Sequence, residues 1–271
     1  MAVAAYRWLR ASPAQRRQVG SWLKFVETEY GLAFVEETRL FGKVVVMFMP
    51  VVFFWTMLSQ CGTEWQNQYE RMNKQYLGVI PIPTEASSNI GAILISVMVP
   101  SLVKWVYPFL ERRGMDVCLV NRMVWGFFFL ILGVSVSTCL NYYVDAHTKN
   151  IVYKDNVVVS CEGCVNGAWQ LPQWFLMALA ESLLCPSGIH LCYTQVGKQL
   201  KASSFSIFLL SASIGNYLII LIDGFLKGIG SPTNRQWIYL AITSLAFLAF
   251  LLLGKFWYVS KETSILQSIN N

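Results

Sequence analysis

Uncharged, mainly apolar residues occur along the chain in six long segments separated by shorter polar stretches. Each segment is close to the roughly 20 residues with which a helix crosses the ~30 Å hydrocarbon core of a bilayer. The apolar residues are continuous rather than alternating, which excludes a transmembrane β-barrel. The pattern therefore predicts an all-α membrane protein with six transmembrane helices. The charge-free segments are 44–63, 86–103, 123–144, 163–180 with 182–197, 202–222 and 236–254.

These segments define one bundle, which we place at residues 41–260. Residues 1–40 alternate charged and aromatic side chains, a pattern typical of amphipathic helices on a membrane surface, and are interpreted as a cytoplasmic linker. Residues 261–271 are predicted to be a cytoplasmic tail. The helices are expected at about 41–61, 86–110, 122–143, 168–195, 203–226 and 236–256.

Composition and charge support this class. Of the 271 residues, 55% are hydrophobic and 13% charged, whereas a soluble domain has about 25% charged residues. The termini and alternate loops hold 14 Lys and Arg residues, and the intervening loops hold 6. Because short cytoplasmic loops collect positive charge, both termini are predicted to be cytoplasmic. The net charge of +6 follows from this topology and predicts no nucleic-acid partner. We expect a multi-pass protein, surrounded by lipid, in the plasma or an endolysosomal membrane.

Two cysteines stand apart from the others because they lie in the long outer loop 145–166. Cys161 and Cys164 form a C-x-x-C sequence there. A disulfide is the favoured interpretation, with two free thiols as the alternative. A zinc site would need two more ligands, and His147 is the only nearby candidate. No metal is therefore predicted.

Prolines fall inside three of the six predicted helices. They are Pro50, Pro100 with Pro108, and Pro172 with Pro186. An interior proline leaves a carbonyl without its helical donor and bends the helix. Prolines are common in membrane helices in general, but several in one bundle favour a protein that moves.

Glu181 is the residue most indicative of function. It lies between 18 and 16 uncharged residues near the middle of the fourth predicted helix. A carboxylate at the bilayer centre costs at least ~2.5 kcal/mol, so it must face protein, water or a cation. It can hold either a proton or a cationic ligand. The alternative is a structural carboxylate paired within the protein.

Enzyme chemistry finds little support in the sequence. The chain has two histidines, no G-x-S-x-G motif and no glycine-rich phosphate loop. No nucleophile therefore has a visible base beside it. We predict a transport or interaction protein and not an enzyme.

Polar residues near the helix ends resemble motifs of the proton-coupled oligopeptide transporters. Residues 53–68 read F-F-W-T-M-L-S-Q-C-G-T-E-W-Q-N-Q, similar to the seventh-helix pattern F-W-A-L-F-D-Q-Q-G-S-x-W-x-x-Q of animal members. Residues 92–108, with Pro100 and Tyr107-Pro108, resemble the eighth helix. The longest match runs from W-Q-L-P-Q at 169–173 through Glu181, Gly188 and Tyr193-Thr194-Gln195 to Lys201 and Gly215-Asn216.

This resemblance covers nearly all of residues 20–260 and implies a major-facilitator fold of two six-helix halves. The chain resembles the second half, preceded by the linker between the halves. The implied activity is uptake of di- and tripeptides with protons as the coupling ion and without another cofactor. The implied partner is an N-terminal six-helix half or a full-length relative. The alternative is a non-transporting half-bundle that binds or regulates a full-length transporter.

The resemblance also implies site residues. Glu181 corresponds to the tenth-helix glutamate that receives the peptide amino group, Trp55 to a seventh-helix aromatic residue of the pocket, and Lys43 to a basic gating residue. The residues expected to contact peptide are Glu181, Trp55, Phe54, Asn89, Phe208 and Ser211.

The sequence departs from the family pattern at several positions. Gly91 aligns with the eighth-helix Asn that contacts the peptide backbone, and Asn89 lies two positions earlier. Val103 aligns with the Asp that pairs with the gating cation, so Lys43 loses that partner. Phe208 stands in place of a Trp. The first-half motif E-x-x-E-R, which supplies proton and carboxyl-end contacts in the family, does not occur in the chain.

Overall fold

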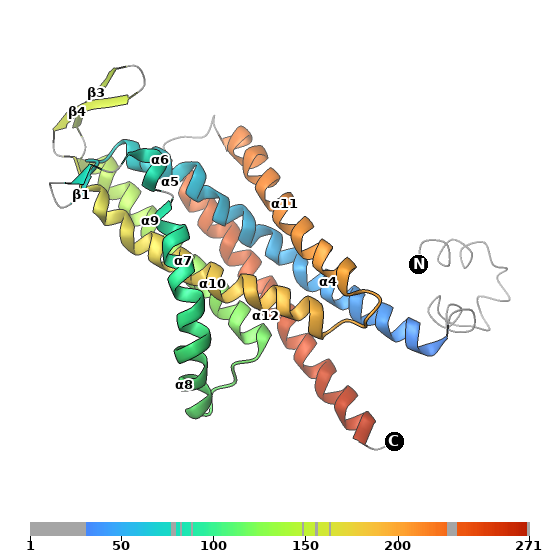
Figure 1. The fold of residues 1–271 in the computed structure, drawn as a ribbon. Helices are drawn as coiled ribbons and strands as arrows, with labels where there is room; N and C mark the ends of the chain where they lie inside the picture. Colours follow the sequence, from blue (N-terminus) through green and yellow to red (C-terminus); the bar gives the residue numbers. More distant parts are fainter. Residues whose placement is uncertain are drawn as a thin grey trace.

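In the computed structural model of the chain, the long helices run roughly side by side (Figure 1). The structure describes residues 31–76, 80–81, 83–87, 89–147, 149–154, 157–162, 164–226 and 232–269. Among these, six helical spans are long and apolar enough to cross a membrane, which confirms the predicted fold class. The spans are Phe34–Glu70, Asn89–Arg112, Leu119–His147, Gly167–Thr194, Lys201–Leu226 and Asn234–Lys255.

The first helix, α4 (Leu32–Leu58), begins earlier than the sequence indicates. Gly31 precedes it with φ of 85°, a left-handed conformation that favours glycine and marks the helix start. Residues 32–40 of the predicted linker are therefore helical and continuous with the first span. The rest of the predicted linker, residues 1–30, lies outside the described residues. The last helix, α12 (Pro232–Ile269), likewise extends well past the predicted end at residue 256.

The first span breaks near its C-terminal end into η1 (Ser59–Gly62), one 3₁₀ turn, and α5 (Glu64–Glu70). The second span consists of α7 (Asn89–Ser101), η2 (Leu102–Val106) and α8 (Tyr107–Arg112). Within η2, a π-helical turn, the amide of Tyr107 donates to the carbonyl of Leu102, five residues earlier. Pro108 follows directly and removes the donor that an α-helix would place opposite Lys104.

The other helices are α9 (Leu119–His147), α10 (Leu171–Thr194) and α11 (Lys201–Leu226). Of the predicted interior prolines, Pro50, Pro100 and Pro186 do lie inside helices. Pro172 occupies the first turn of α10, where a missing amide proton costs little, whereas Pro108 lies within the continuous second span directly after the π turn.

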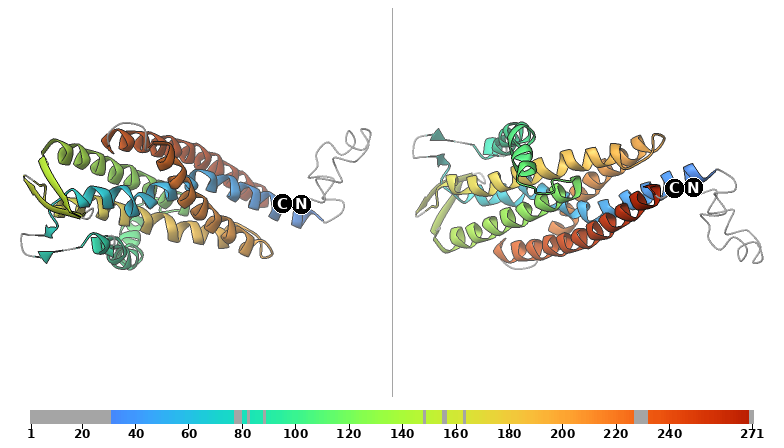
Figure 2. Two further views of the ribbon diagram at one scale, coloured as in Figure 1. Left: turned by 90° about the horizontal axis from the view of Figure 1, so that it is seen from above. Right: turned by 90° about the horizontal axis from the view of Figure 1, so that it is seen from below.

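The core of the described chain lies where α4, α9, α10 and α12 meet, with α11 packed along α4. Gly126 lets α9 approach α10, since a Cβ atom there would lie 3.0 Å from the carbonyl oxygen of Ala180. The helices α7 and α8 stand off to one side of the bundle (Figure 2). Only 11% of the most apolar stretch of the span Asn89–Arg112 is buried, whereas 56% is buried in the span that contains α10. The central residues include Phe48, Phe54, Met57, Met123, Phe127, Ala180, Leu184, Phe208 and Phe250.

Short polar elements join the helices at the end of the bundle that carries α5. The strands β1 (Gln75–Tyr76) and β2 (Ile80–Pro81) pair antiparallel and precede α6 (Thr84–Ser87). The segment predicted as a long loop contains an antiparallel hairpin of β3 (Lys149–Lys154) and β4 (Val157–Glu162). The turn η3 (Gly167–Gln170) then leads into α10.

The cysteines of the predicted outer disulfide lie in and after β4. Cys164 is disulfide-bonded, and its Sγ lies 3.6 Å from the carbonyl oxygen of Arg71. The side chain of Cys161 lies outside the described residues. The pairing of Cys161 with Cys164 therefore stays a prediction.

A cluster of buried glutamines connects α5 to the start of α10. Gln68, Gln170 and Gln173 are each 0% exposed. The Oε1 atom of Gln68 accepts hydrogen bonds from Nε2 of Gln170 at 3.0 Å and of Gln173 at 3.1 Å. Gln68 Nε2 donates to the carbonyl of Ser137 on α9, and Gln170 also donates to the carbonyl of Trp65. This cluster gives the W-Q-L-P-Q motif a structural role.

We predict that Gln68→Leu destabilises the chain much more than Gln66→Leu, a half-buried residue on the same helix. Leucine at 68 removes the acceptor for two buried amide groups, each costing about 1–3 kcal/mol when unpaired. Thermal unfolding of both variants in one detergent should show a melting temperature at least ~5 °C lower for Gln68→Leu. Equal melting temperatures would contradict a stabilising role for the cluster.

Candidate functional site

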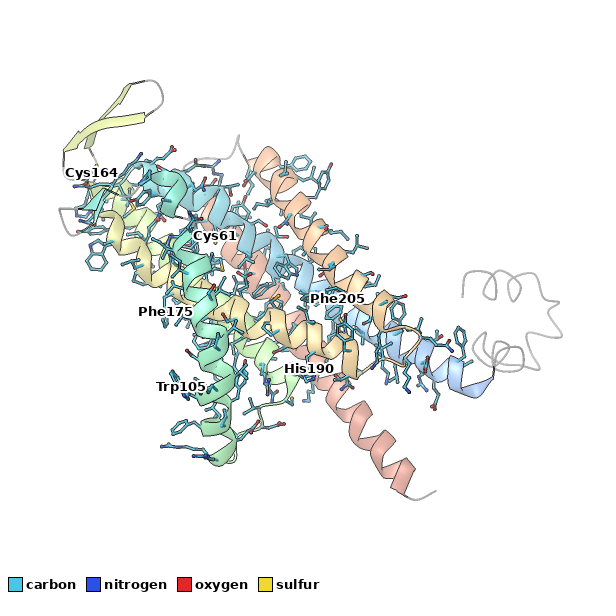
Figure 3. The ribbon with its side chains drawn as sticks, in the orientation of Figure 1. Cys61, Trp105, Cys164, Phe175, His190 and Phe205 are labelled. Carbon is cyan, nitrogen blue, oxygen red and sulfur yellow. The ribbon has the colours of Figure 1, made fainter. Side chains whose placement is uncertain are left out.

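Glu181 lies on α10, and its side chain is half-buried. Within the described part of the chain it makes no ion pair or hydrogen bond. Its carboxylate is close enough to Cys61 on η1 and to Cys185, one turn later on α10, to interact electrostatically with both thiols. Figure 3 labels Cys61 just beyond the end of α4. Glu181 is thus an unpaired carboxylate facing the end of α4.

Aromatic side chains of α4 and α11 meet one and a half turns before Cys61. The ring centres of Trp55 and Phe208 lie 5.9 Å apart, and the two rings meet edge to face. The ring centre of Phe48 lies 5.2 Å from that of Phe208. Gly188 on α10 lies against the same ring, since a Cβ atom there would come within 2.5 Å of Phe208. Phe208 is 1% exposed, whereas Trp55 is half-buried. Trp55 therefore offers the accessible aromatic surface, and Phe208 supports it.

A polar contact adjoins Trp55. The Ser59 hydroxyl lies 2.9 Å from the carbonyl oxygen of Trp55 and 2.5 Å from Oδ1 of Asn216 on α11. A hydroxyl has one proton, so it donates to one of these acceptors at a time. The indole Nε1 of Trp55 is buried and has no hydrogen-bond partner. The sequence motifs include Ser59 and Asn216, but only their contact across two helices marks them as site residues.

Other predicted site residues are placed differently. Phe54 is 0% exposed and packs at 5.3 Å on Phe127 of α9, so it belongs to the core. Ser211 is buried, and its hydroxyl donates to the carbonyl of Phe208 at 2.6 Å within α11. Asn89 is exposed at the first residue of α7. Lys43 lies on α4 twelve residues before Trp55 and is half-buried.

Gly91 explains one departure from the family pattern. A Cβ atom at this position would lie 3.1 Å from the ring of Trp174 on α10. Gly91 is buried and lets α7 approach α10 at this point. A side chain as large as asparagine would displace Trp174, so the family's peptide contact has no room here.

A second polar cluster lies where α11 ends and α12 begins. Arg235 pairs with Glu64 at 3.2 Å, and the hydroxyl of Tyr239 donates to Asp223. Glu64, Asp223 and Arg235 line a cavity of about 410 Å³ together with residues of α5 and α11. Each of these carboxylates has an ion-pair or hydrogen-bond partner, unlike that of Glu181. No group of three metal-ligating side chains occurs among the described residues.

Known proteins resemble the chain in sequence. Solute carrier family 15 member 2 of Danio rerio is 25% identical over 138 residues, which are 51% of this chain and 19% of the relative. Peptide transporter PTR_C of Candidozyma auris is 25% identical over 241 residues, which are 84% of this chain and 38% of the relative. These relatives are named as a carrier and a transporter, and neither as an enzyme.

Solved structures share the fold. An auto-inhibited POT family peptide transporter aligns with a TM-score of 0.75 at 20% identity, covering 86% of this chain and 44% of that one. The POT family transporter PepTSo aligns with a TM-score of 0.72 at 18% identity, covering 95% and 53%. The chain thus spans about half the length of these transporters.

The sequence profile of the POT family matches residues 17–238, most of the chain. This match includes the motifs around Trp55 and Glu181 and confirms the family resemblance drawn from them. The chain belongs to the POT family of peptide transporters.

Proposed function

We propose that the chain is the C-terminal six-helix half of a major-facilitator transporter that moves di- and tripeptides together with protons. The observation that carries this proposal is the unpaired, half-buried carboxylate of Glu181 on a membrane-spanning helix. Family membership supports peptide transport. The chain covers 44% and 53% of two solved transporters, which supports the assignment to one half.

The geometry indicates how this half contributes to binding. An unpaired carboxylate in a membrane is unfavourable until a cation or a proton neutralises it. The amino group of a peptide can do so, and in its absence a proton can. Exchange between the two would couple peptide movement to proton movement. Trp55 supplies an apolar surface for a peptide side chain, and the neighbouring Ser59 and Asn216 supply polar groups.

The other end of the peptide requires a second group of residues. The E-x-x-E-R motif, which provides carboxyl-end and proton contacts in the family, does not occur in the chain. A site between two halves needs both halves, so the proposed partner is an N-terminal six-helix half. The same observation favours the second candidate function, a half-bundle that binds and regulates a full-length relative.

In the proposed orientation both termini lie in the cytoplasm, whether the protein is in the plasma membrane or in an endolysosomal membrane. The 14 to 6 division of Lys and Arg among the loops supports it. In this orientation the β3–β4 hairpin and the disulfide of Cys164 lie outside the cytoplasm, where an oxidising compartment maintains disulfides.

Uptake measurements test the proposed function. Cells without endogenous peptide uptake would express the 271-residue chain alone, with an N-terminal half from a POT family relative, or with a full-length relative. We expect proton-driven uptake of a labelled dipeptide only when the chain and the N-terminal half are present together. No uptake by this pair, with altered uptake by the full-length relative, would instead establish the regulatory function.

In the active pair, Glu181→Gln should abolish uptake of dipeptides with a free amino end. Breaking a buried charge pair costs about 3–5 kcal/mol, roughly a 150- to 5000-fold loss of affinity. The change keeps side-chain volume, so the melting temperature should stay near that of the wild type. Glu36→Gln, at an exposed position on α4, is the matched control.

N-acetylated dipeptides provide the second comparison, because they lack the amino group that we assign to Glu181. The wild type should therefore take up free peptides faster than N-acetylated ones, and Glu181→Gln should take up both at similar rates. Equal losses for both peptides, together with a large drop in melting temperature, would make Glu181 a structural residue.

A further inference from the structure

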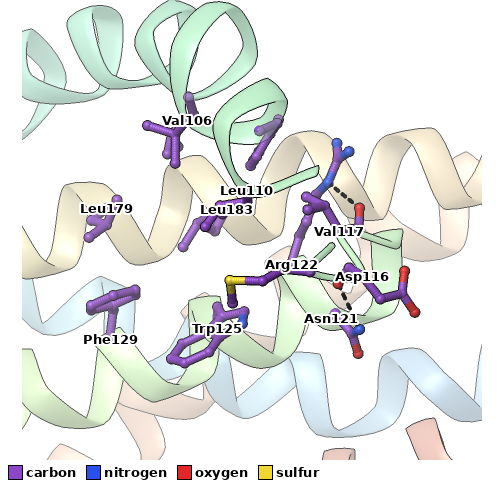
Figure 4. Close-up of a pocket in the computed structure, with 13 residues that line it drawn as sticks. Val106, Leu110, Asp116, Val117, Asn121, Arg122, Trp125, Phe129, Leu179 and Leu183 are labelled. Atoms are coloured by element: carbon purple, nitrogen blue, oxygen red, sulfur yellow. Dashed lines mark hydrogen bonds between the residues drawn. The ribbon is translucent and has the colours of Figure 1, made fainter. Parts of the chain in front are cut away.

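A cavity of about 440 Å³ lies between α8, the start of α9 and the middle of α10 (Figure 4). Its size is within the range of roughly 300–1,000 Å³ found for ligand sites. Its walls are mainly apolar, and one arginine stands at the edge. The wall residues that matter most here are Leu102, Leu110, Trp125, Phe129, Leu179 and Leu183.

The π turn before Pro108 shapes this cavity. Tyr107 at the end of this turn is 8% exposed and lines the cavity, while α7 and α8 together stand off from the rest of the bundle (Figure 2). The cavity therefore opens sideways between helices that span the membrane, with Val106, Met115 and Trp125 each 39–48% exposed along it. Water would solvate such side chains poorly, whereas hydrocarbon chains of a lipid match them.

Arg122 is held at the edge of the cavity in a fixed orientation. Its Nε donates to the carbonyl of Val117 at 2.9 Å, and the guanidinium carbon lies 4.0 Å from the ring centre of Tyr107. Within the described residues, its two terminal nitrogens have no hydrogen-bond partner. A guanidinium fixed in this way presents the planar pair of donors that fits a phosphate group.

The segment 104–122, which supplies many of the residues that line the cavity, has a net positive charge. Residues 104–122 contain four cations and two anions, Glu111 and Asp116. Asp116 also lines the cavity, but its carboxylate accepts a hydrogen bond from the amide of Cys118 at 3.1 Å. Basic pockets between membrane helices attract anionic lipid headgroups. The four cations are Lys104, Arg112, Arg113 and Arg122.

We propose that this cavity binds one anionic phospholipid, with an acyl chain along the apolar wall and its phosphate on Arg122. The cavity has an apolar wall next to a cationic edge, just as the lipid has an apolar acyl chain next to an anionic headgroup. This charge complementarity favours a lipid over a second copy of the bundle, whose matching face would bring the same cations together. The site is separate from Glu181, which lies on α10 between Leu179 and Leu183 but about 160° around the helix from both.

Native mass spectrometry of the full chain in detergent tests the proposal. The chain is titrated with phosphatidylglycerol, or with phosphatidylcholine carrying the same acyl chains. We expect one tightly retained phosphatidylglycerol. Arg122→Gln should weaken its binding about tenfold, equivalent to about 1.4 kcal/mol, and leave phosphatidylcholine unchanged. Arg39→Gln, at an exposed cation on α4, is the matched control and should have no effect.

Leu179→Trp provides a test that keeps every charge. Leu179 is half-buried in the cavity wall, and an indole there should fill the space and reduce retention of phosphatidylglycerol. Circular dichroism and melting curves establish that each variant is folded, and this variant decides the question if Arg122→Gln does not fold.

Several results would overturn the proposal. Equal retention of the two lipids would show that the net negative charge of the headgroup is not recognised, and equal losses in Arg122→Gln and Arg39→Gln would reduce the binding to diffuse attraction. Displacement of the lipid by glycerol 3-phosphate alone would make the site one for a soluble phosphate. A stable dimer that retains no lipid would assign the face to a second copy.

Discussion

The hydrogen bonds of Gln68 hold the arrangement on which the candidate site depends. In a membrane, buried amide groups find no water, so they must pair within the protein. Gln68 on α5 accepts from Gln170 and Gln173 and thereby fixes α5 over the start of α10. The turn η1 precedes α5 directly and carries Cys61 toward Glu181. The glutamine cluster thus helps to position this turn and Ser59 within it.

Glu181 contrasts with this cluster and with the other buried charges. Glu64 pairs with Arg235, and Asp223 accepts from Tyr239. The polar groups beside α5 therefore contribute to a stable scaffold. Glu181 alone among these carboxylates has no such partner in the described chain, although its location makes an unpaired charge costly. A carboxylate without a partner, in a described chain whose other buried carboxylates have one, is characteristic of a functional site.

The sequence predicts the spans well because crossing a membrane imposes a length and an absence of charge. It predicts boundaries less well: α4 starts at Leu32 because of the conformation of Gly31, which hydropathy does not record. It also cannot assign adjacent aromatic residues to faces. Phe54 and Trp55 are ~100° apart on a helix, and only packing against α9 and α11 decides that Phe54 enters the core. The Ser59–Asn216 contact joins residues 157 positions apart and likewise needs the fold.

The helix α10 links the two proposed sites through opposite faces. Glu181 faces the end of α4, while Leu179 and Leu183 line the cavity beside α8. Pro186 lies inside the same helix one turn beyond Leu183, at a point where backbone hydrogen bonding is interrupted. A lipid in the cavity would favour whichever arrangement of α8 and α10 it contacts better. It would change the population of that arrangement only as far as its affinities for the two states differ. A lipid that binds both states equally well would leave Glu181 unaffected. Any coupling between the two sites therefore requires that α8 or α10 move during transport.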